Sequence, residues 1–127
     1  MTLAYWMLLV AIVLPYAFTG FAKFQGGFGP RENHNPREFL AGLEGARKRA
    51  HWAQLNSFEV TPAFAVALLM AHQIGAAAQG TLDTIAVLFV VARVAYGVCY
   101  IADWASLRSL VWFASMACII AFFVVSA

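Results

Sequence analysis

Four long apolar runs dominate this sequence, and each is long enough to cross a lipid bilayer as a helix. Spanning the hydrocarbon core takes roughly 20 apolar residues, and a single run satisfies its own backbone hydrogen bonds only as a helix. Only 11% of the 127 residues are charged, whereas about a quarter are charged in a soluble domain. The sequence therefore predicts an all-α integral membrane four-helix bundle, with spans at about 3–21, 47–74, 82–102 and 107–125.

The connection between the first two spans is the only substantial polar segment, and it holds most of the basic residues. Six of the eight lysines and arginines lie between residues 23 and 49, and Arg108 lies in the connection before the fourth span. The turn around residues 75–83 has no basic residue, so the positive-inside rule places the 23–46 loop in the cytoplasm and both termini outside. Because four crossings consume most of the chain, we expect one transmembrane domain over residues 1–127.

Composition and residue spacing exclude several classes of partner. The net charge is only +2, which argues against nucleic acid as a partner. The two cysteines, Cys99 and Cys118, fall inside apolar runs, and neither they nor the three histidines follow a metal-type spacing. No metal site is therefore expected, and both cysteines are expected to pack as small apolar residues.

Two spans carry polar residues that are unfavourable on a lipid-facing helix. Ionisable groups at membrane depth are costly unless they are paired or hydrated, so Glu59 and Arg93 are the most informative of them. The second span enters from the cytoplasm and the third returns to it, so the two polar faces are predicted to meet near the cytoplasmic end. The second span carries Arg49, Gln54, Asn56 and Glu59, and the third carries Arg93, Tyr96 and Tyr100.

A purely structural interpretation of these residues stays open. Glu59 and Arg93 can form an ion pair that fixes the second span against the third, with Asn56 as an interhelical hydrogen-bonding residue. Tyr100 lies near the cytoplasmic boundary, where tyrosines are common in membrane proteins. A structural pair, however, requires neither two tyrosines in line with Arg93 nor an arginine-rich rim.

Two segments of these spans resemble the MAPEG family, the membrane-associated proteins in eicosanoid and glutathione metabolism. In the second span, an asparagine is followed by a glutamate three residues on and by a proline shortly after. In the third, an arginine is followed by a tyrosine three residues on and by another four further. The matching segments are Ala53–Pro62 and Arg93–Tyr100, and Asn35–Glu38 resembles the small bacterial branch of the family.

This resemblance implies a homotrimer in a bacterial inner membrane that binds glutathione, as a co-substrate, between neighbouring subunits near the cytosolic face. Arg108 lies one residue beyond a family arginine that is implicated with the glutathione thiol. The positions that match glutathione contacts in the leukotriene synthase branch are Gln54, Asn56, Glu59, Tyr96 and Tyr100.

The leading hypothesis is therefore a glutathione-dependent transferase or peroxidase that acts on a lipophilic small molecule arriving through the membrane lipids. A tripeptide with two carboxylates needs cationic and amide donors, and its thiol needs a nearby positive charge or hydroxyl donor to ionise. Glu59 would bind the amino group or orient Arg93. The donors assigned to the tripeptide are Arg49, Arg93, Gln54 and Asn56, with Tyr96 beside them, and the catalytic residues assigned to the thiol are Arg108 and Tyr100.

The alternative is a non-catalytic MAPEG-like scaffold or accessory subunit. The family usually has an arginine four residues before Asn56, whereas this chain has Trp52. Only Lys23 lies near the end of the first span, where the leukotriene branch has an arginine. These departures favour the accessory role, whereas the two tyrosines and Arg108 favour the enzyme.

Overall fold

Four long helices make up most of this chain in a computed structural model, which describes residues 1–127. They are α1 (Leu3–Phe24), α3 (Gly45–Ile74), α4 (Gln79–Ile101) and α5 (Ala105–Ser126). All four are long and apolar enough to cross a membrane, which confirms the prediction of an all-helical chain with four spans. Most helices are slightly longer than the sequence indicates, since α1 continues to Phe24 and α4 begins at Gln79.

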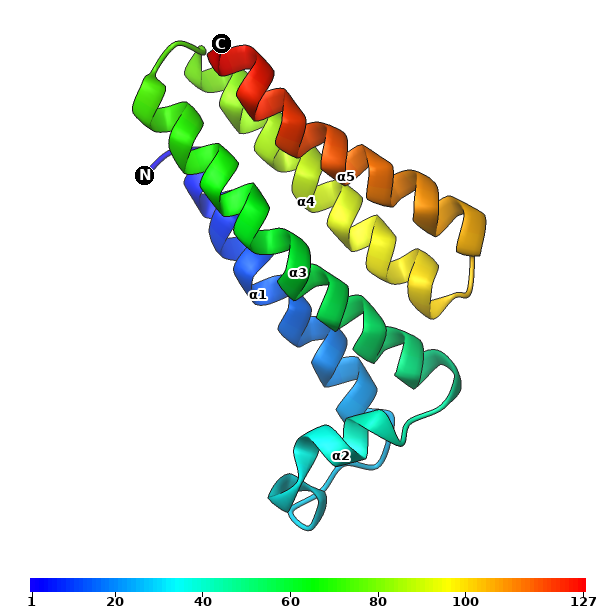
Figure 1. The fold of residues 1–127 in the computed structure, drawn as a ribbon. Coiled ribbons are helices and arrows are strands. Elements are labelled where there is room, and N and C mark those ends of the chain that lie inside the picture. Colours follow the sequence, from blue (N-terminus) through cyan, green and yellow to red (C-terminus); the bar gives the residue numbers. More distant parts are fainter.

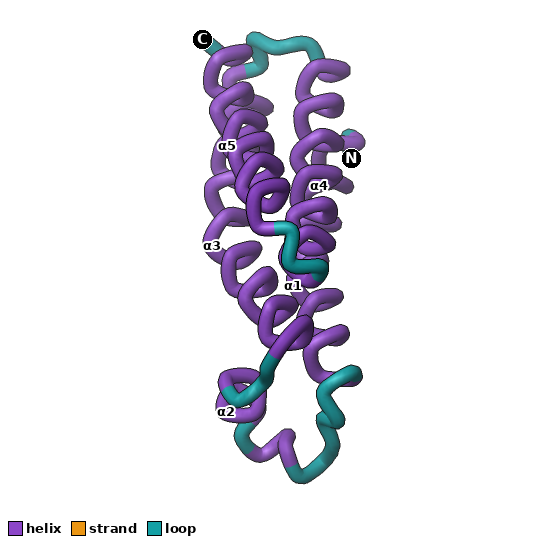
Figure 2. Tube along the Cα trace, turned by 90° about the vertical axis from the view of Figure 1, so that its right-hand side faces the viewer, coloured by secondary structure: helices purple, strands orange, loops and turns teal.

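The four helices lie side by side and run alternately up and down (Figure 1). Both termini lie at one end of the bundle, and the connection between α1 and α3 lies at the other (Figure 2). Helix α4 packs against α1, α3 and α5, and α1 also packs along α3. The N-terminal turns of α3 and the last turn of α4 therefore lie at the same end of the molecule.

The main core fills the half of the bundle nearer the termini. The rings of Phe64 and Phe89 stack with centroids 3.9 Å apart, and Phe122 packs against Phe64. Buried alanines such as Ala67 and Ala86 surround these rings and allow the helices to approach closely. Only 28 of the 127 residues are buried, so a large part of the apolar surface is left for lipid or for other subunits.

Specific contacts define the helix ends. At the end of the bundle where both chain termini lie, the Asp83 carboxylate, near the start of α4, accepts a 2.8 Å hydrogen bond from the Ala4 amide. Asp83 therefore caps the N-terminus of α1. Gly75 ends α3 with a φ of 70°, a conformation that glycine adopts without a steric penalty. Asp103 adopts a φ of 65° in the tight turn between α4 and α5.

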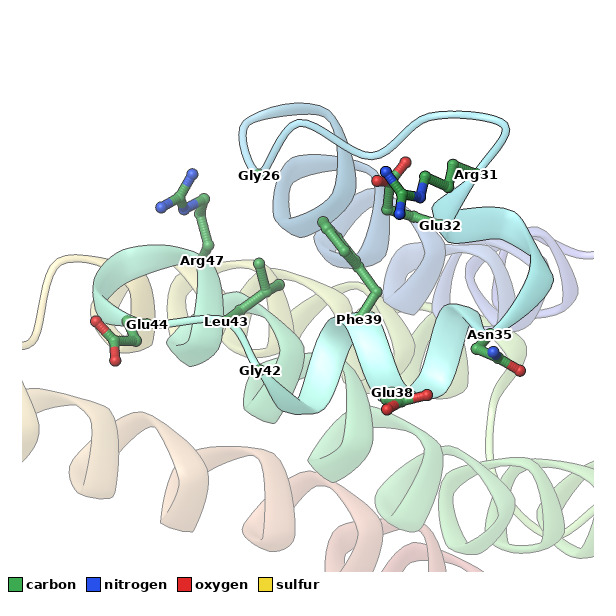
Figure 3. Close-up of a pocket in the computed structure, with 10 residues that line it drawn as sticks. All are labelled: Gly26, Arg31, Glu32, Asn35, Glu38, Phe39, Gly42, Leu43, Glu44 and Arg47. Atoms are coloured by element: carbon green, nitrogen blue, oxygen red, sulfur yellow. The ribbon is translucent and has the colours of Figure 1, made fainter.

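The connection from α1 to α3 is ordered by two short helices that the sequence interpretation treated as loop. They are η1 (Glu32–His34) and α2 (Pro36–Ala41). Leu40 and Leu43 bury their side chains against Ala22 of α1 and Ala50 of α3, which fixes this lobe to the bundle. A wide, open pocket of about 820 Å³ lies on this connection, between Gly26 and Arg47. Arg31 and Arg47 lie on opposite sides of the Phe39 ring in it (Figure 3).

Candidate functional site

Arg93 is the centre of a polar cluster that joins α3 to α4. Its side chain is only 2% exposed. One guanidinium nitrogen, Nη2, donates to Asn56 Oδ1 at 2.9 Å and to Ser57 Oγ at 3.0 Å. These bonds bring the polar faces of the two helices to one depth, in the half of the bundle nearer the α1–α3 connection.

The direct ion pair between Glu59 and Arg93 is not formed. Arg93 donates to Asn56 and Ser57 instead, and the exposed Glu59 carboxylate accepts a 3.3 Å hydrogen bond from Asn56 Nδ2. The reason is geometric, because Arg93 projects between the helices whereas Glu59 lies on the exposed surface of α3. An asparagine amide accepts at its oxygen and donates at its nitrogen, so Asn56 links the arginine to the carboxylate.

One donor of this cluster has no partner within the chain. Arg93 Nη1 is buried and makes no hydrogen bond. A buried donor left unpaired costs about 1–3 kcal/mol, and more when it is charged. The Tyr96 ring, whose centroid lies 4.2 Å from Arg93 Cζ, offsets part of this cost through a cation–π contact. Nη1 of Arg93 is therefore a buried donor that no acceptor of the chain satisfies.

The last turns of α4 and the first turn of α5 bring together the two residues assigned to the thiol. Arg108 Cζ lies 4.4 Å from the centroid of the Tyr100 ring. Tyr100 in turn packs edge-to-face with Tyr96 at 5.5 Å. A continuous series of two arginines and two tyrosines thus runs from Arg93, inside the bundle, to Arg108 at its surface.

Two adjoining hollows flank this series. The larger has a volume of about 400 Å³ and lies along the surface of α3 and α4. The smaller, of about 270 Å³, lies between those helices and α5, and Asn56 and Tyr96 line both. The larger is lined by Trp52, Leu55, Asn56, Glu59, Tyr96 and Tyr100, and the smaller by Asn56, Tyr96, Arg108, Ser109, Trp112 and Phe113.

Three residues assigned to the site from the sequence line neither hollow: Arg93, which is buried between α3 and α4, and Arg49 and Gln54. Arg49 donates from Nε and Nη2 to the carbonyl oxygen of Ile101, at 3.1 and 2.9 Å. It thereby satisfies an acceptor that the end of α4 leaves unpaired. Gln54 Oε1 is 3.1 Å from Nδ1 of His51. Arg49 and Gln54 share α3 with Asn56 and Glu59, but each already has a partner within the chain.

Sequence reasoning also missed residues that the structure brings into the site. Ser57 accepts from Arg93 and is almost fully buried, and a small hydroxyl residue directly after Asn56 in an apolar span was a signal for it. Trp52, treated as a departure from the family pattern, forms a wall of the larger hollow. Trp112 and Phe113 come from α5, whose polar pattern is too sparse to mark them.

Comparison with known proteins places the chain in one family. No curated protein matches it. The family model described as MAPEG matches residues 3–127, a range that includes all four spans and every residue of both hollows. The arginine–tyrosine series, the Asn56–Glu59 pair and this match together show that the chain belongs to the MAPEG family.

Proposed function

We propose that this protein is a glutathione-dependent membrane transferase or peroxidase that acts on apolar electrophiles at the cytoplasmic side of the bilayer. The observation that carries the proposal is the larger hollow, where Asn56, Glu59, Tyr96 and Tyr100 converge, with Arg108 stacked on Tyr100 at its edge. Membership of a family of glutathione and eicosanoid metabolism supports glutathione as the co-substrate.

The polar groups of the hollow match the ends of glutathione. The exposed Glu59 carboxylate is a partner for the ammonium group of the γ-glutamyl residue. Arg93 lines neither hollow, but it contacts Asn56 and Tyr96, which line both. Its unpaired Nη1 would donate to a tripeptide oxygen that enters between those residues, and such an acceptor would remove the cost of leaving that donor buried and unpaired. Asn56 is already bonded to both residues, so it fixes their relative positions.

Arg108 and Tyr100 are suited to hold the glutathione thiol as its thiolate. A free thiol has a pKa of about 8.5, so a nearby positive charge or hydroxyl donor is required for substantial ionisation at neutral pH. The Tyr100 hydroxyl donates to the sulfur, and the Arg108 guanidinium stabilises its negative charge. In the transferase reaction the sulfur bonds to the electrophilic carbon, and the leaving group departs with the bonding electron pair.

The peroxidase reaction uses the same thiolate. The sulfur attacks the hydroxyl oxygen of the peroxide and becomes a sulfenic acid as the O–O bond breaks, and the departing alkoxide takes a proton from water and leaves as the alcohol. A second glutathione thiol then attacks that sulfur, so that glutathione disulfide forms and water is released. No further protein residue is required beyond those that ionise the thiol.

The surface around the smaller hollow fits an acceptor that arrives from the bilayer. Phe113, at its edge, is 64% exposed, and Leu55 beside the larger hollow is 45% exposed. In a homotrimer, a neighbouring subunit would cover part of this apolar surface and enclose the site. The basic α1–α3 connection lies at the end of the bundle opposite the termini (Figure 2). The site lies nearer that end, since Asn56 is in the first half of α3 and Tyr100 is near the end of α4. In a bacterial inner membrane this end would face the cytoplasm.

Glutathione titration of the purified protein in lipid nanodiscs tests the proposal. We expect saturable binding, thiolate absorbance and conjugation of a nitroaromatic halide. Arg93→Leu and Glu59→Gln are each expected to weaken binding, whereas Arg37→Leu, at an exposed position of the α1–α3 connection, is the matched control. Absence of both binding and thiolate signal at millimolar glutathione would refute the enzyme.

One observation favours a second candidate, a non-catalytic accessory subunit. Arg49 is bonded to the end of α4 and Gln54 is paired with His51, so two conspicuous polar residues already have structural partners. An accessory subunit would assemble stably in the membrane and bind no glutathione. In that case Arg93→Leu would lower thermal stability, and neither the wild type nor the variant would bind glutathione.

A further inference from the structure

We propose that Lys48 is a further binding residue of the larger hollow, where its ammonium group binds the glycine carboxylate of glutathione while Trp52 holds it in place. This inference rests on the proposed function, which it deepens by naming the cation that recognises the far end of the tripeptide.

Lys48 is positioned by an aromatic side chain that belongs to the hollow itself. Its Nζ lies 5.6 Å from the centroid of the Trp52 ring, and Trp52 lines the hollow one helical turn further along α3. Lys48 is half-buried, yet its ammonium has no hydrogen bond or ion pair within the chain. The cation–π contact therefore orients the side chain toward Trp52 and leaves its three N–H donors free.

The neighbouring cations on α3 are already engaged. Arg47 donates to the carbonyl oxygen of Gln25 at 2.8 Å, and Arg49 donates twice to the carbonyl oxygen of Ile101. Of the three consecutive basic residues, Lys48 alone has no hydrogen-bond partner, and it contacts Trp52, which lines the hollow. A carboxylate at the Trp52 end of the hollow would therefore meet Lys48.

The length of the hollow fits the tripeptide in one orientation. Trp52 and Glu59 are seven residues apart, which corresponds to about 10 Å along an α-helix. An extended chain of three α-linked residues spans about 10 Å, and the γ-glutamyl linkage of glutathione adds two further bonds, which gives the reach needed to pass Trp52 toward Lys48. With the γ-glutamyl ammonium at Glu59, the glycine carboxylate reaches the level of Trp52, where the Lys48 ammonium lies.

The experiment compares glutathione with its glycine ethyl ester, in which that carboxylate is neutral. Binding is measured by calorimetry on the full-length protein in nanodiscs. We expect the wild type to prefer glutathione over the ester by about fivefold to tenfold, the size of one partly exposed charge-assisted bond. Lys48→Met is expected to lose this preference while binding the ester normally, and Lys48→Arg to keep it.

Two further variants separate the role of Lys48 from a general charge effect. Trp52→Leu removes the surface that holds Lys48, so the preference for glutathione is expected to fall although the lysine remains. Lys23→Met is the matched control, because Lys23 also lies on an aromatic ring, that of Phe28 at 4.3 Å, but Phe28 lines neither hollow, whereas Trp52 lines the larger one. This control is expected to leave the preference unchanged.

The possible failures are distinguishable. A wild type that binds both ligands equally, or a Lys48→Met variant that keeps the preference, would overturn the role of Lys48 and leave the proposed function standing. Equal weakening of both ligands in Lys48→Met would also overturn it, since the effect would not depend on the carboxylate. A wild type that binds neither ligand would overturn the proposed function and this inference together.

Discussion

Replacing Gly97 with alanine is expected to destabilise the bundle, although alanine is the better helix former. Gly97 lies inside α4, where the ring of Phe18 from α1 packs directly against it. A Cβ at this position would overlap two atoms of that ring and crowd a third. Phe18 is only 7% exposed and packs with Ala53 and Tyr96, so the ring cannot move without disturbing the base of the site.

The expected magnitude follows from two opposing effects. Overpacking a buried contact costs about 1–3 kcal/mol, and we take the upper part of that range because two ring atoms overlap the new Cβ and a third lies close to it. Alanine for glycine in a helix interior recovers about 1 kcal/mol. The net change in the free energy of unfolding is then a loss of about 2 kcal/mol. Gly20→Ala in α1 is the control, since its new methyl group would meet Phe24 only at ordinary contact distances of 3.9 and 4.0 Å.

Reversible unfolding in mixed micelles, followed by circular dichroism, measures both variants. Gly97→Ala is expected to unfold more easily than the wild type and Gly20→Ala to be equally or more stable. In a Phe18→Leu background the ring is absent, so Gly97→Ala is expected to become neutral or stabilising. If Gly97→Ala matched Gly20→Ala in the wild-type background, the close approach of α1 to α4 described above would be refuted.

Three further perturbations test separate contacts. Arg49→Met removes the side chain that donates to the carbonyl oxygen of Ile101 at the end of α4, and is expected to lower the free energy of unfolding by about 1–2 kcal/mol. Calorimetry is expected to show an unchanged affinity for glutathione, and a large loss of affinity would instead place Arg49 in the binding site. Asp83→Ala removes the carboxylate that caps α1 and is expected to cost about 1 kcal/mol, whereas Asp83→Asn keeps an acceptor oxygen and loses less; equal losses would contradict the capping role. Asp103→Gly is expected to raise thermal stability, because glycine adopts the positive φ of 65° without strain, and a lower melting temperature would show that the Asp103 side chain makes a contribution of its own.

Part of the site could be predicted because it depends on properties of single helices. Asn56 and Glu59 are three residues apart, as are Arg93 and Tyr96, and helical periodicity places each pair on one face. Antiparallel neighbours then bring both faces to one depth. Tyr100 follows Tyr96 by the same periodicity, and the family pattern added Arg108, which lies against the Tyr100 ring.

The pairing within the site could not be predicted in the same way. Helical spacing allows either Ser57 or Glu59 to be the partner of Arg93. Only the direction in which α4 faces α3 decides that Arg93 bonds Asn56 and Ser57. Likewise, the engagement of Arg49 depends on where α4 ends, because Ile101 must lie beside the first turns of α3 for the bond to form.

The sequence by itself determined that this chain has four membrane spans, one basic connection and two polar helix faces. Hydropathy and helical periodicity are local properties, and a bilayer leaves a long apolar run few alternatives to a helix. Only the tertiary structure decided which polar groups are paired and which remain free. Arg93 Nη1 and the Lys48 ammonium are free because the rotation and relative height of packed helices, which no single run of residues specifies, determine the partners of each side chain.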